Sequence, residues 1–150
     1  MGSGKVYKCK ECGNRFRMST GVGMLYPMSY ENTVKDILSG KYGEEWKQFL
    51  EEHQDGRVNC EIVLLICEKC GVPKCDMDLS LYLPRKGKKG VAYPFSVHFK
   101  ESYKLYARYP HTCDCCGGAC KVCDKERPPV MKCKECSGVL EDTWEFILWD

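Results

Sequence analysis

"YKCKECGNRF", residues 7–16, places two cysteines three positions apart and follows the second with glycine. "LICEKCGVPK", residues 65–74, repeats this pattern. Two thiolates separated by two residues can reach one tetrahedral metal ion, and the glycine supplies the positive φ that such a turn needs. The repeated phrase therefore predicts metal-binding knuckles.

Two further knuckles follow, "CDCCGG" at 113–118 and "CKECSG" at 133–138, so eight of the 13 cysteines form four C-x-x-C pairs. A disulfide scaffold of a secreted chain is the alternative at this cysteine content. The odd count and the lack of an apolar leader favour thiolates held by zinc in a reducing, cytoplasmic setting. No apolar run approaches the roughly 20 residues of a membrane span, so we expect no membrane association.

Spacing predicts how the knuckles combine. The last two are 16 residues apart, which fits a compact ribbon over 110–150 that holds one metal with Cys113, Cys116, Cys133 and Cys136. By analogy, the first two would form another ribbon over 1–83, with Cys9, Cys12, Cys67 and Cys70 as ligands. A helical insertion at about 30–54 would interrupt this first ribbon, since Trp46, Phe49 and Leu50 form one apolar stripe. The sequence thus predicts a small β-rich α+β fold with two zinc ribbons.

Five cysteines remain outside this scheme. The five are expected to be small buried hydrophobes, most clearly Cys60 inside an apolar stretch, and Cys75, five positions beyond Cys70, could instead be an alternative ligand. Cys120 and Cys123 form a fifth C-x-x-C, which could replace Cys113 and Cys116 in a rival site with Cys133 and Cys136. A third metal could use His111, Cys115, Cys120 and Cys123.

The connecting segment 84–109 is basic and rich in aromatic residues. Basic side chains contact phosphates and aromatic rings stack on unpaired bases, so a nucleic-acid partner is one interpretation. The competing interpretation, which we favour, is a solvated linker whose aromatic rings pack in the core. The candidate nucleic-acid-binding residues are Arg85, Lys86, Lys88, Lys89, Lys100, Lys104 and Arg108.

These phrases resemble the zinc-ribbon superfamily. The wider layout, with "GVGMLYP" at 21–27 and a terminal "ILWD", resembles small double zinc-ribbon proteins of Firmicute-type bacteria. The resemblance implies one metal for Cys9, Cys12, Cys67 and Cys70, and another for Cys113, Cys116, Cys133 and Cys136. It carries no activity with it.

Catalysis is not expected. Four-cysteine sites are closed, and the three histidines lack the H-x-E and H-E-x-x-H spacings of zinc deaminases and proteases. The formal charge of +2 would fall to about −2 with two four-thiolate zinc sites, so net charge predicts no partner. We expect a non-catalytic zinc protein, with no small-molecule substrate, that acts as a protein-interaction module. The alternatives are a nucleic-acid-binding ribbon protein and a thiol-redox protein that uses Cys115, Cys120 or Cys123.

Overall fold

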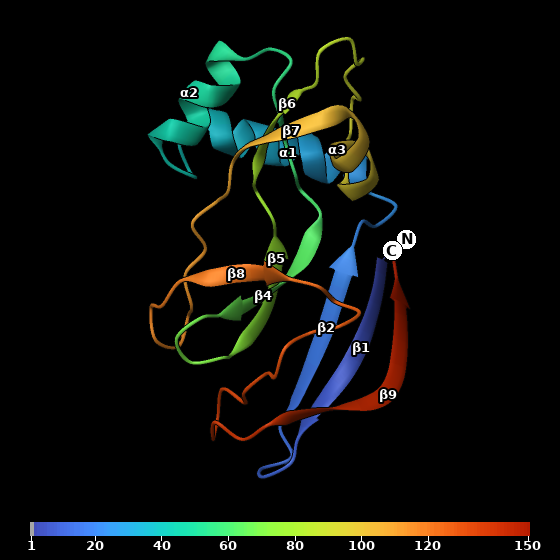
Figure 1. Ribbon diagram of the computed structural model, residues 1–150, viewed down its shortest axis with the longest axis vertical. Helices are drawn as coiled ribbons and strands as arrows, with labels where there is room; N and C mark the ends of the chain where they lie inside the picture. The colour runs from blue at the N-terminus through green and yellow to red at the C-terminus, as the bar shows by residue number, and fades with distance from the viewer. Residues whose placement is uncertain (1) are drawn as a thin grey trace. The chain divides into compact units, whose positions relative to one another are not determined.

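The computed structural model describes residues 2–150, which form two compact units (Figure 1). The ribbon unit contains the described residues up to Gly23, together with Ile62–Asp76 and Pro110–Asp150. The helical unit contains Met24–Glu61 and Met77–Tyr109. Segments of the two units alternate along the chain. The units therefore differ from the consecutive segments 1–83, 84–109 and 110–150 expected from the sequence. The predicted fold class, small and β-rich α+β, is confirmed.

The sheet of the ribbon unit is built from two three-stranded halves. Ribbon A comprises the hairpin of β1 (Gly2–Cys9) and β2 (Arg15–Gly21), with β9 (Leu140–Trp149) antiparallel to β1. Ribbon B comprises β4 (Ile62–Cys67), β5 (Pro73–Met77) and β8 (Cys120–Cys123), with β8 antiparallel to β4. The halves join where Gly21 pairs with Ile62. The sheet order is therefore β5-β4-β2-β1-β9, with β8 on β4.

The core of the ribbon unit lies between these two halves. Side chains alternate along each strand, so Tyr7 and Cys9 of β1 point to the same buried face. The cluster that fills this core contains Tyr7, Cys9, Met18, Leu64, Ile66, Met131, Cys133 and Leu140. Two of its members, Cys9 and Cys133, are knuckle cysteines, so the first and last knuckles are continuous with the hydrophobic core.

The helical unit folds around its own core. Its helices are α1 (Tyr26–Leu38), α2 (Glu44–Glu52) and α3 (Ser96–Ser102). Its sheet has the order β3-β6-β7, with strands β3 (Arg57–Val58), β6 (Leu81–Pro84) and β7 (Tyr103–Ala107). The helical stretch expected at about 30–54 is present as α1 and α2. Trp46 and Phe49 of the predicted stripe are buried, and the Trp46 indole donates a 2.7 Å hydrogen bond to the Leu79 carbonyl.

Most aromatic rings of segment 84–109 pack inside the helical unit. Phe99 and Tyr103 are buried, Tyr93 lies edge-on against Tyr30, and Tyr109 lies edge-on against Trp46. The burial of Phe99 and Tyr103, together with the ring contacts of Tyr93 and Tyr109, agrees with the packed-core interpretation of this segment. No helix within residues 2–150 is long and apolar enough to cross a membrane.

Candidate metal centres

Two clusters of four cysteines stand in the ribbon unit. In each cluster the four Sγ atoms lie within 4.8 Å of one another. Centre A contains Cys9, Cys12, Cys133 and Cys136, and centre B contains Cys67, Cys70, Cys113 and Cys116. All eight predicted ligand residues therefore lie in these two clusters, but the predicted pairing of the knuckles is wrong. The first knuckle joins the last, and the two middle knuckles join each other.

Strand pairing explains this arrangement. In ribbon A, β9 begins just after the Cys133–Cys136 knuckle and runs along β1, which brings that knuckle beside Cys9. In ribbon B, β8 follows the Cys113–Cys116 knuckle and runs along β4 beside Cys67. Equivalent hydrogen bonds join the knuckles, from the Lys10 N–H to the Val139 carbonyl (3.1 Å) and from the Glu68 N–H to the Ala119 carbonyl (2.8 Å).

All four knuckles share one backbone conformation. The N–H of the residue after the second cysteine donates to the carbonyl of the first cysteine, over 2.9–3.1 Å. That residue has a positive φ in each knuckle: 74° at Gly13, 75° at Gly71, 71° at Gly117 and 62° at Ser137. Glycine adopts this conformation without the steric cost of a Cβ. The positive φ predicted for the residue after the second cysteine is present in all four knuckles, with glycine at three of them and Ser137 at the fourth.

The sulfur positions fit one tetrahedral ion per centre. Sγ–Sγ distances are 3.4 Å for Cys9–Cys136 and 3.7 Å for Cys12–Cys133 in centre A. They are 3.5 Å for Cys67–Cys116 and 3.6 Å for Cys70–Cys113 in centre B. A tetrahedron with metal–sulfur bonds of about 2.3 Å has edges of about 3.8 Å. These sulfurs are too far apart for disulfides, and all 13 cysteines, which fall within the described residues, are free.

Backbone N–H groups stabilise negative charge on the first cysteine of each knuckle. At Cys67 the Cys70 N–H is the main cause, and with the Lys69 N–H it lowers the pKa to about 6. At Cys133 burial opposes ionisation, but the Glu135 and Cys136 N–H groups outweigh it and lower the pKa to about 6. Metal binding needs thiolates, so each knuckle prepares one sulfur for a cation.

The pKa is raised at the second cysteine of three of the pairs, namely Cys12, Cys70 and Cys136. The Gly138 N–H favours the thiolate of Cys136, but the neighbouring sulfurs of Cys9 and Cys12 outweigh it and raise the pKa to about 12. At Cys70 the Val72 N–H favours the thiolate, but burial and the neighbouring sulfurs of Cys113 and Cys67 outweigh it and raise the pKa to about 12. Without a cation, like charges would repel at such distances. A metal dication removes this conflict and would ionise all four sulfurs.

Two glycines that the sequence analysis did not identify allow the knuckles to close. A Cβ on Gly138 would lie 2.8 Å from the Cys9 sulfur and 3.2 Å from the Cys136 sulfur. A Cβ on Gly118 would lie 3.1 Å from the Cys67 sulfur. Asn14 was also missed, and its side-chain amide donates to the Cys133 sulfur over 3.7 Å. The "GG" and "SG" after the later knuckles could have identified the two glycines from the sequence, whereas no sequence feature pointed to Asn14.

The rival and third sites proposed from the sequence are not assembled. Among the described residues, the clusters of three or more potential ligands are centres A and B alone. Cys133 and Cys136 combine with Cys9 and Cys12, so the rival site with Cys120 and Cys123 is wrong. His111, Cys115, Cys120 and Cys123 do not converge on one point. Cys75 and Cys123 pack against the core instead, and Cys60 is buried as expected.

None of the three thiols considered for redox chemistry has a lowered pKa. Burial is the main cause of a raised pKa at Cys115, at Cys120 and at Cys123, and at Cys120 the value reaches about 11. The neighbouring sulfurs of Cys67 and Cys113 add to the effect at Cys120. These side chains are thus thiols rather than thiolates near neutral pH.

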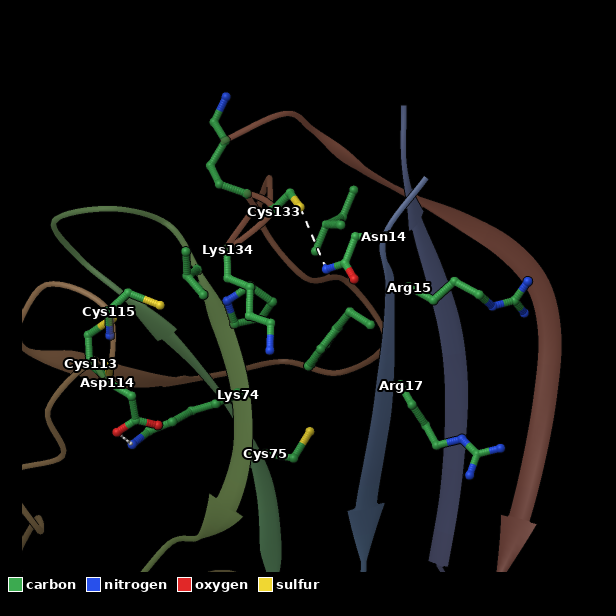
Figure 2. A pocket seen from close by; sticks show the side chains of 16 residues that line it. Asn14, Arg15, Arg17, Lys74, Cys75, Cys113, Asp114, Cys115, Cys133 and Lys134 are labelled. Carbon is green, nitrogen blue, oxygen red and sulfur yellow. Dashed lines mark hydrogen bonds and ion pairs between the residues drawn. The ribbon is translucent and has the colours of Figure 1, made fainter. Parts of the chain in front are cut away.

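A cavity of about 490 Å³ opens between the two ribbons (Figure 2). Phe16, Val72, Pro73 and Leu140 give it apolar walls, and the non-ligand thiols Cys75, Cys115 and Cys120 also line it. Lys74 reaches the Thr112 carbonyl (2.8 Å) and Asp114 (3.5 Å). Figure 2 shows the side chains of Arg15 and Arg17 directed across β1, away from Lys74 and Asp114.

The basic residues proposed for nucleic-acid binding belong to the helical unit. Residues 85–90, which include Arg85, Lys86, Lys88 and Lys89, are all exposed. Lys100 lies on α3, Lys104 on β7 and Arg108 just after it, and all three are exposed. Within residues 2–150, none of the seven forms an ion pair.

No family model, no curated protein and no solved structure matches the chain.

Proposed function

We propose that the chain is a zinc-ribbon protein that holds one zinc ion in each of centres A and B. The observation that supports this most directly is the convergence of eight cysteine sulfurs into two tetrads with near-tetrahedral spacing. Four thiolates in this geometry suit zinc or iron. The knuckle turns, with backbone N–H groups directed at the sulfurs, suit a structural zinc site. Each ion would hold one ribbon together, because each centre joins two knuckles that are distant in the sequence.

Metal analysis tests this proposal. Elemental analysis of protein purified without added metal should give two zinc per chain, and the solution should be colourless. An iron–thiolate centre would absorb visible light, so a coloured protein containing iron would contradict the choice of zinc. Fewer than two metals per chain after reconstitution with excess zinc would contradict the two-centre proposal itself.

The role that we propose is structural rather than catalytic. Each centre draws four identical ligands from the protein, whereas a catalytic zinc keeps a position for water. The raised pKa values of Cys115, Cys120 and Cys123 give no support to a thiol catalyst, which needs a ready thiolate.

The proposed role is to present a binding surface to a protein partner. Strand β9 is at the edge of its sheet and exposes Trp144 by 88%, Phe146 by 64% and Leu148 by 61%. These three residues alternate along the strand, beside backbone groups with no neighbouring strand. An exposed apolar edge strand promotes aggregation unless a partner covers it. Extended peptides bind to such edges by strand addition. We call these three residues the β9 stripe.

Peptide selection tests this role. An extended-peptide library would be selected on the zinc-loaded chain and counter-selected on Trp144→Ser/Phe146→Ser. Bound peptides should slow amide exchange in β9. The matched control is Met24→Ser/Met28→Ser, which changes exposed apolar residues near the start of α1 and should leave binding intact. Peptides that bind both β9 variants equally, or that protect other segments, would contradict the proposal.

Nucleic-acid binding remains a second candidate, because the seven cations of segment 85–108 are exposed and unpaired by acids. Fluorescence anisotropy with single- and double-stranded oligonucleotides across a salt series would test it. Binding through phosphates should weaken with salt, with a log–log slope of about 0.7–0.9 per contact. Neutralising Lys86, Lys88 and Lys89 should reduce that slope, whereas neutralising Lys35, Lys41 and Lys47 should not. No binding at low salt would eliminate this candidate.

A further inference from the structure

Ribbons A and B differ at one position directly beside their metal centres. In ribbon A, Leu140 is the strand partner of the ligand Cys9. In ribbon B, Cys120 is the strand partner of the ligand Cys67. The two positions are structurally equivalent, because the Leu140 N–H donates to the Met131 carbonyl and the Cys120 N–H donates to the His111 carbonyl, each over 3.0 Å. Centre B therefore has a fifth thiol where centre A has an apolar side chain.

The register places Cys67 and Cys120 within reach of a disulfide. Directly opposed residues of antiparallel strands have Cα atoms about 4.5–5.5 Å apart, and their side chains leave the same face of the sheet. Disulfides span Cα–Cα distances of about 4.4–6.8 Å. The Cα spacing expected for this pair therefore lies within the range that a disulfide spans. The equivalent bond is impossible in ribbon A, because leucine stands opposite Cys9.

Small oxidants can approach this pair through the cavity between the ribbons. Cys120 is partly exposed and lines that cavity, together with the centre B ligand Cys113. Cys67 is 2% exposed and belongs to centre B. A molecule the size of a peroxide fits easily in about 490 Å³.

We propose that Cys67 and Cys120 form an oxidation site through which a hydroperoxide opens centre B selectively. The proposal rests on the zinc centres proposed above. Oxidation would join the two sulfurs in a disulfide, which takes one of the four ligands from centre B. Three sulfurs would remain, and the ion would dissociate more readily. Centre A has no thiol opposite Cys9 and would keep its ion for longer.

The chemistry balances with one hydroperoxide. One sulfur of the pair attacks the O–O bond, forming a sulfenic acid and releasing the alcohol or, from hydrogen peroxide, water. The other sulfur then displaces the hydroxyl group, forming the S–S bond and releasing water. The two sulfurs lose two electrons, and the peroxide bond gains them. Because Cys67 begins as a metal-bound thiolate, water supplies one of the protons that the products carry.

The test uses the full chain loaded with zinc, and hydrogen peroxide as the oxidant. The zinc content is measured first, release is followed with a chromophoric zinc indicator, and disulfides are mapped by mass spectrometry without reduction. We expect the first zinc equivalent to leave about tenfold faster than the second, since the partner thiol is already in place. The early disulfide should be Cys67–Cys120.

Three variants isolate the pair. Cys120→Leu copies ribbon A and should abolish the fast phase. Leu140→Cys places a thiol opposite Cys9 and should create a second fast phase. Cys115→Ser removes another thiol that lines the same cavity and should leave the kinetics unchanged. Each variant is used only after it is shown to bind two zinc ions.

The outcomes separate this inference from the proposed function. Two bound zinc ions with no fast phase, or a fast phase that survives Cys120→Leu, would overturn the oxidation site and leave the zinc centres standing. Early disulfides confined to single knuckles, such as Cys67–Cys70, would also overturn it. If the chain binds no zinc, the proposed function fails. The disulfide map of the metal-free chain then decides whether Cys67 and Cys120 are the preferred pair.

Discussion

The sulfurs of Cys9 and Cys136 lie 3.4 Å apart, although 127 positions separate these residues in the chain. The loop that centre A closes therefore contains almost the whole polypeptide, and the loop that centre B closes lies within it. Enlarging a loop from the 16 residues between the last two knuckles to the 121 positions between Cys12 and Cys133 is about three doublings. At about 0.6 kcal/mol per doubling, this adds only about 2 kcal/mol, which the pairing of β9 with β1 can offset.

Paired serine substitutions would test the nested arrangement. Cys9→Ser/Cys133→Ser removes two ligands of centre A alone, so we expect one zinc per chain. Cys9→Ser/Cys67→Ser removes one ligand from each centre, so we expect a large loss of zinc from both. Native mass spectrometry gives the number of ions per chain.

The pairing based on sequence spacing makes the opposite forecast. If Cys9 and Cys67 shared one ion, the Cys9→Ser/Cys67→Ser variant would retain one zinc and the Cys9→Ser/Cys133→Ser variant would lose both. That result would refute the nested arrangement. Cys115→Ser/Cys123→Ser is the matched control, because it removes two cysteines from outside the centres and should retain both ions.

The cysteine pattern was sufficient to identify the eight residues of the two tetrads but not how the knuckles pair. Each C-x-x-C-G turn is a local structure, so the identities of Cys9, Cys67 and the other ligands follow from a few adjacent residues. Which knuckles meet depends on the pairing of β9 with β1, a contact between distant segments that spacing does not encode. The apolar stripe at Trp46 and Phe49 was likewise readable because helix periodicity is local. The opposition of Cys120 to Cys67 depends on strand register and was therefore invisible in the sequence.

Chelation should unfold the ribbon unit and spare the helical unit. Structural zinc sites in small fingers contribute about 10–16 kcal/mol of apparent binding energy, and the ribbon core includes Cys9 and Cys133 themselves. The helical unit has a separate core around Ile37, Trp46 and Leu81. Hydrogen exchange after treatment with a zinc chelator should show loss of protection in β1, β4 and β9. Protection in α1 and α2 should persist.

Two observations would count against this prediction. One is equal loss of protection in the helices, which would mean that the helical unit depends on the metals. The other is full protection of β1 and β9 after zinc removal has been confirmed by elemental analysis. Restoring zinc should return protection to the strands.

Gly138→Ala should weaken zinc binding at centre A. The added Cβ would lie 2.8 Å from both the Cys9 sulfur and the Glu11 side chain, closer than real Cβ contacts allow. Overpacking of this kind costs about 1–3 kcal/mol, which corresponds to about 5- to 150-fold in affinity. Competition with a chelator of known zinc affinity would measure the loss. Centre B should be unaffected, so only one of the two ions should become easier to remove.

Gly117→Ala is the control for this effect. Gly117 has a φ of 71°, but a Cβ there would meet nothing within 4 Å. The substitution therefore introduces about 1 kcal/mol of backbone strain at a knuckle of centre B, while the added methyl group contacts no sulfur. An equal loss of affinity in the two variants would show that contact with the ligand sulfurs adds nothing, and it would contradict the prediction for Gly138→Ala.

Alkaline solution should destabilise the helical unit through Cys60. Burial raises the pKa of the Cys60 thiol to about 12, above its ordinary value near 9, because the interior disfavours the thiolate. The unfolded chain releases this proton first, so stability is complete below pH 9 and falls as the pH rises towards 12. The slope is at most about 1.4 kcal/mol per pH unit. Guanidinium unfolding followed by helical circular dichroism between pH 8 and 10 would measure it, since the described helices all lie in this unit. Cys60→Ala should have a lower free energy of unfolding at pH 8, and that free energy should change less with pH across this range. An unchanged dependence on pH would contradict the assignment to Cys60.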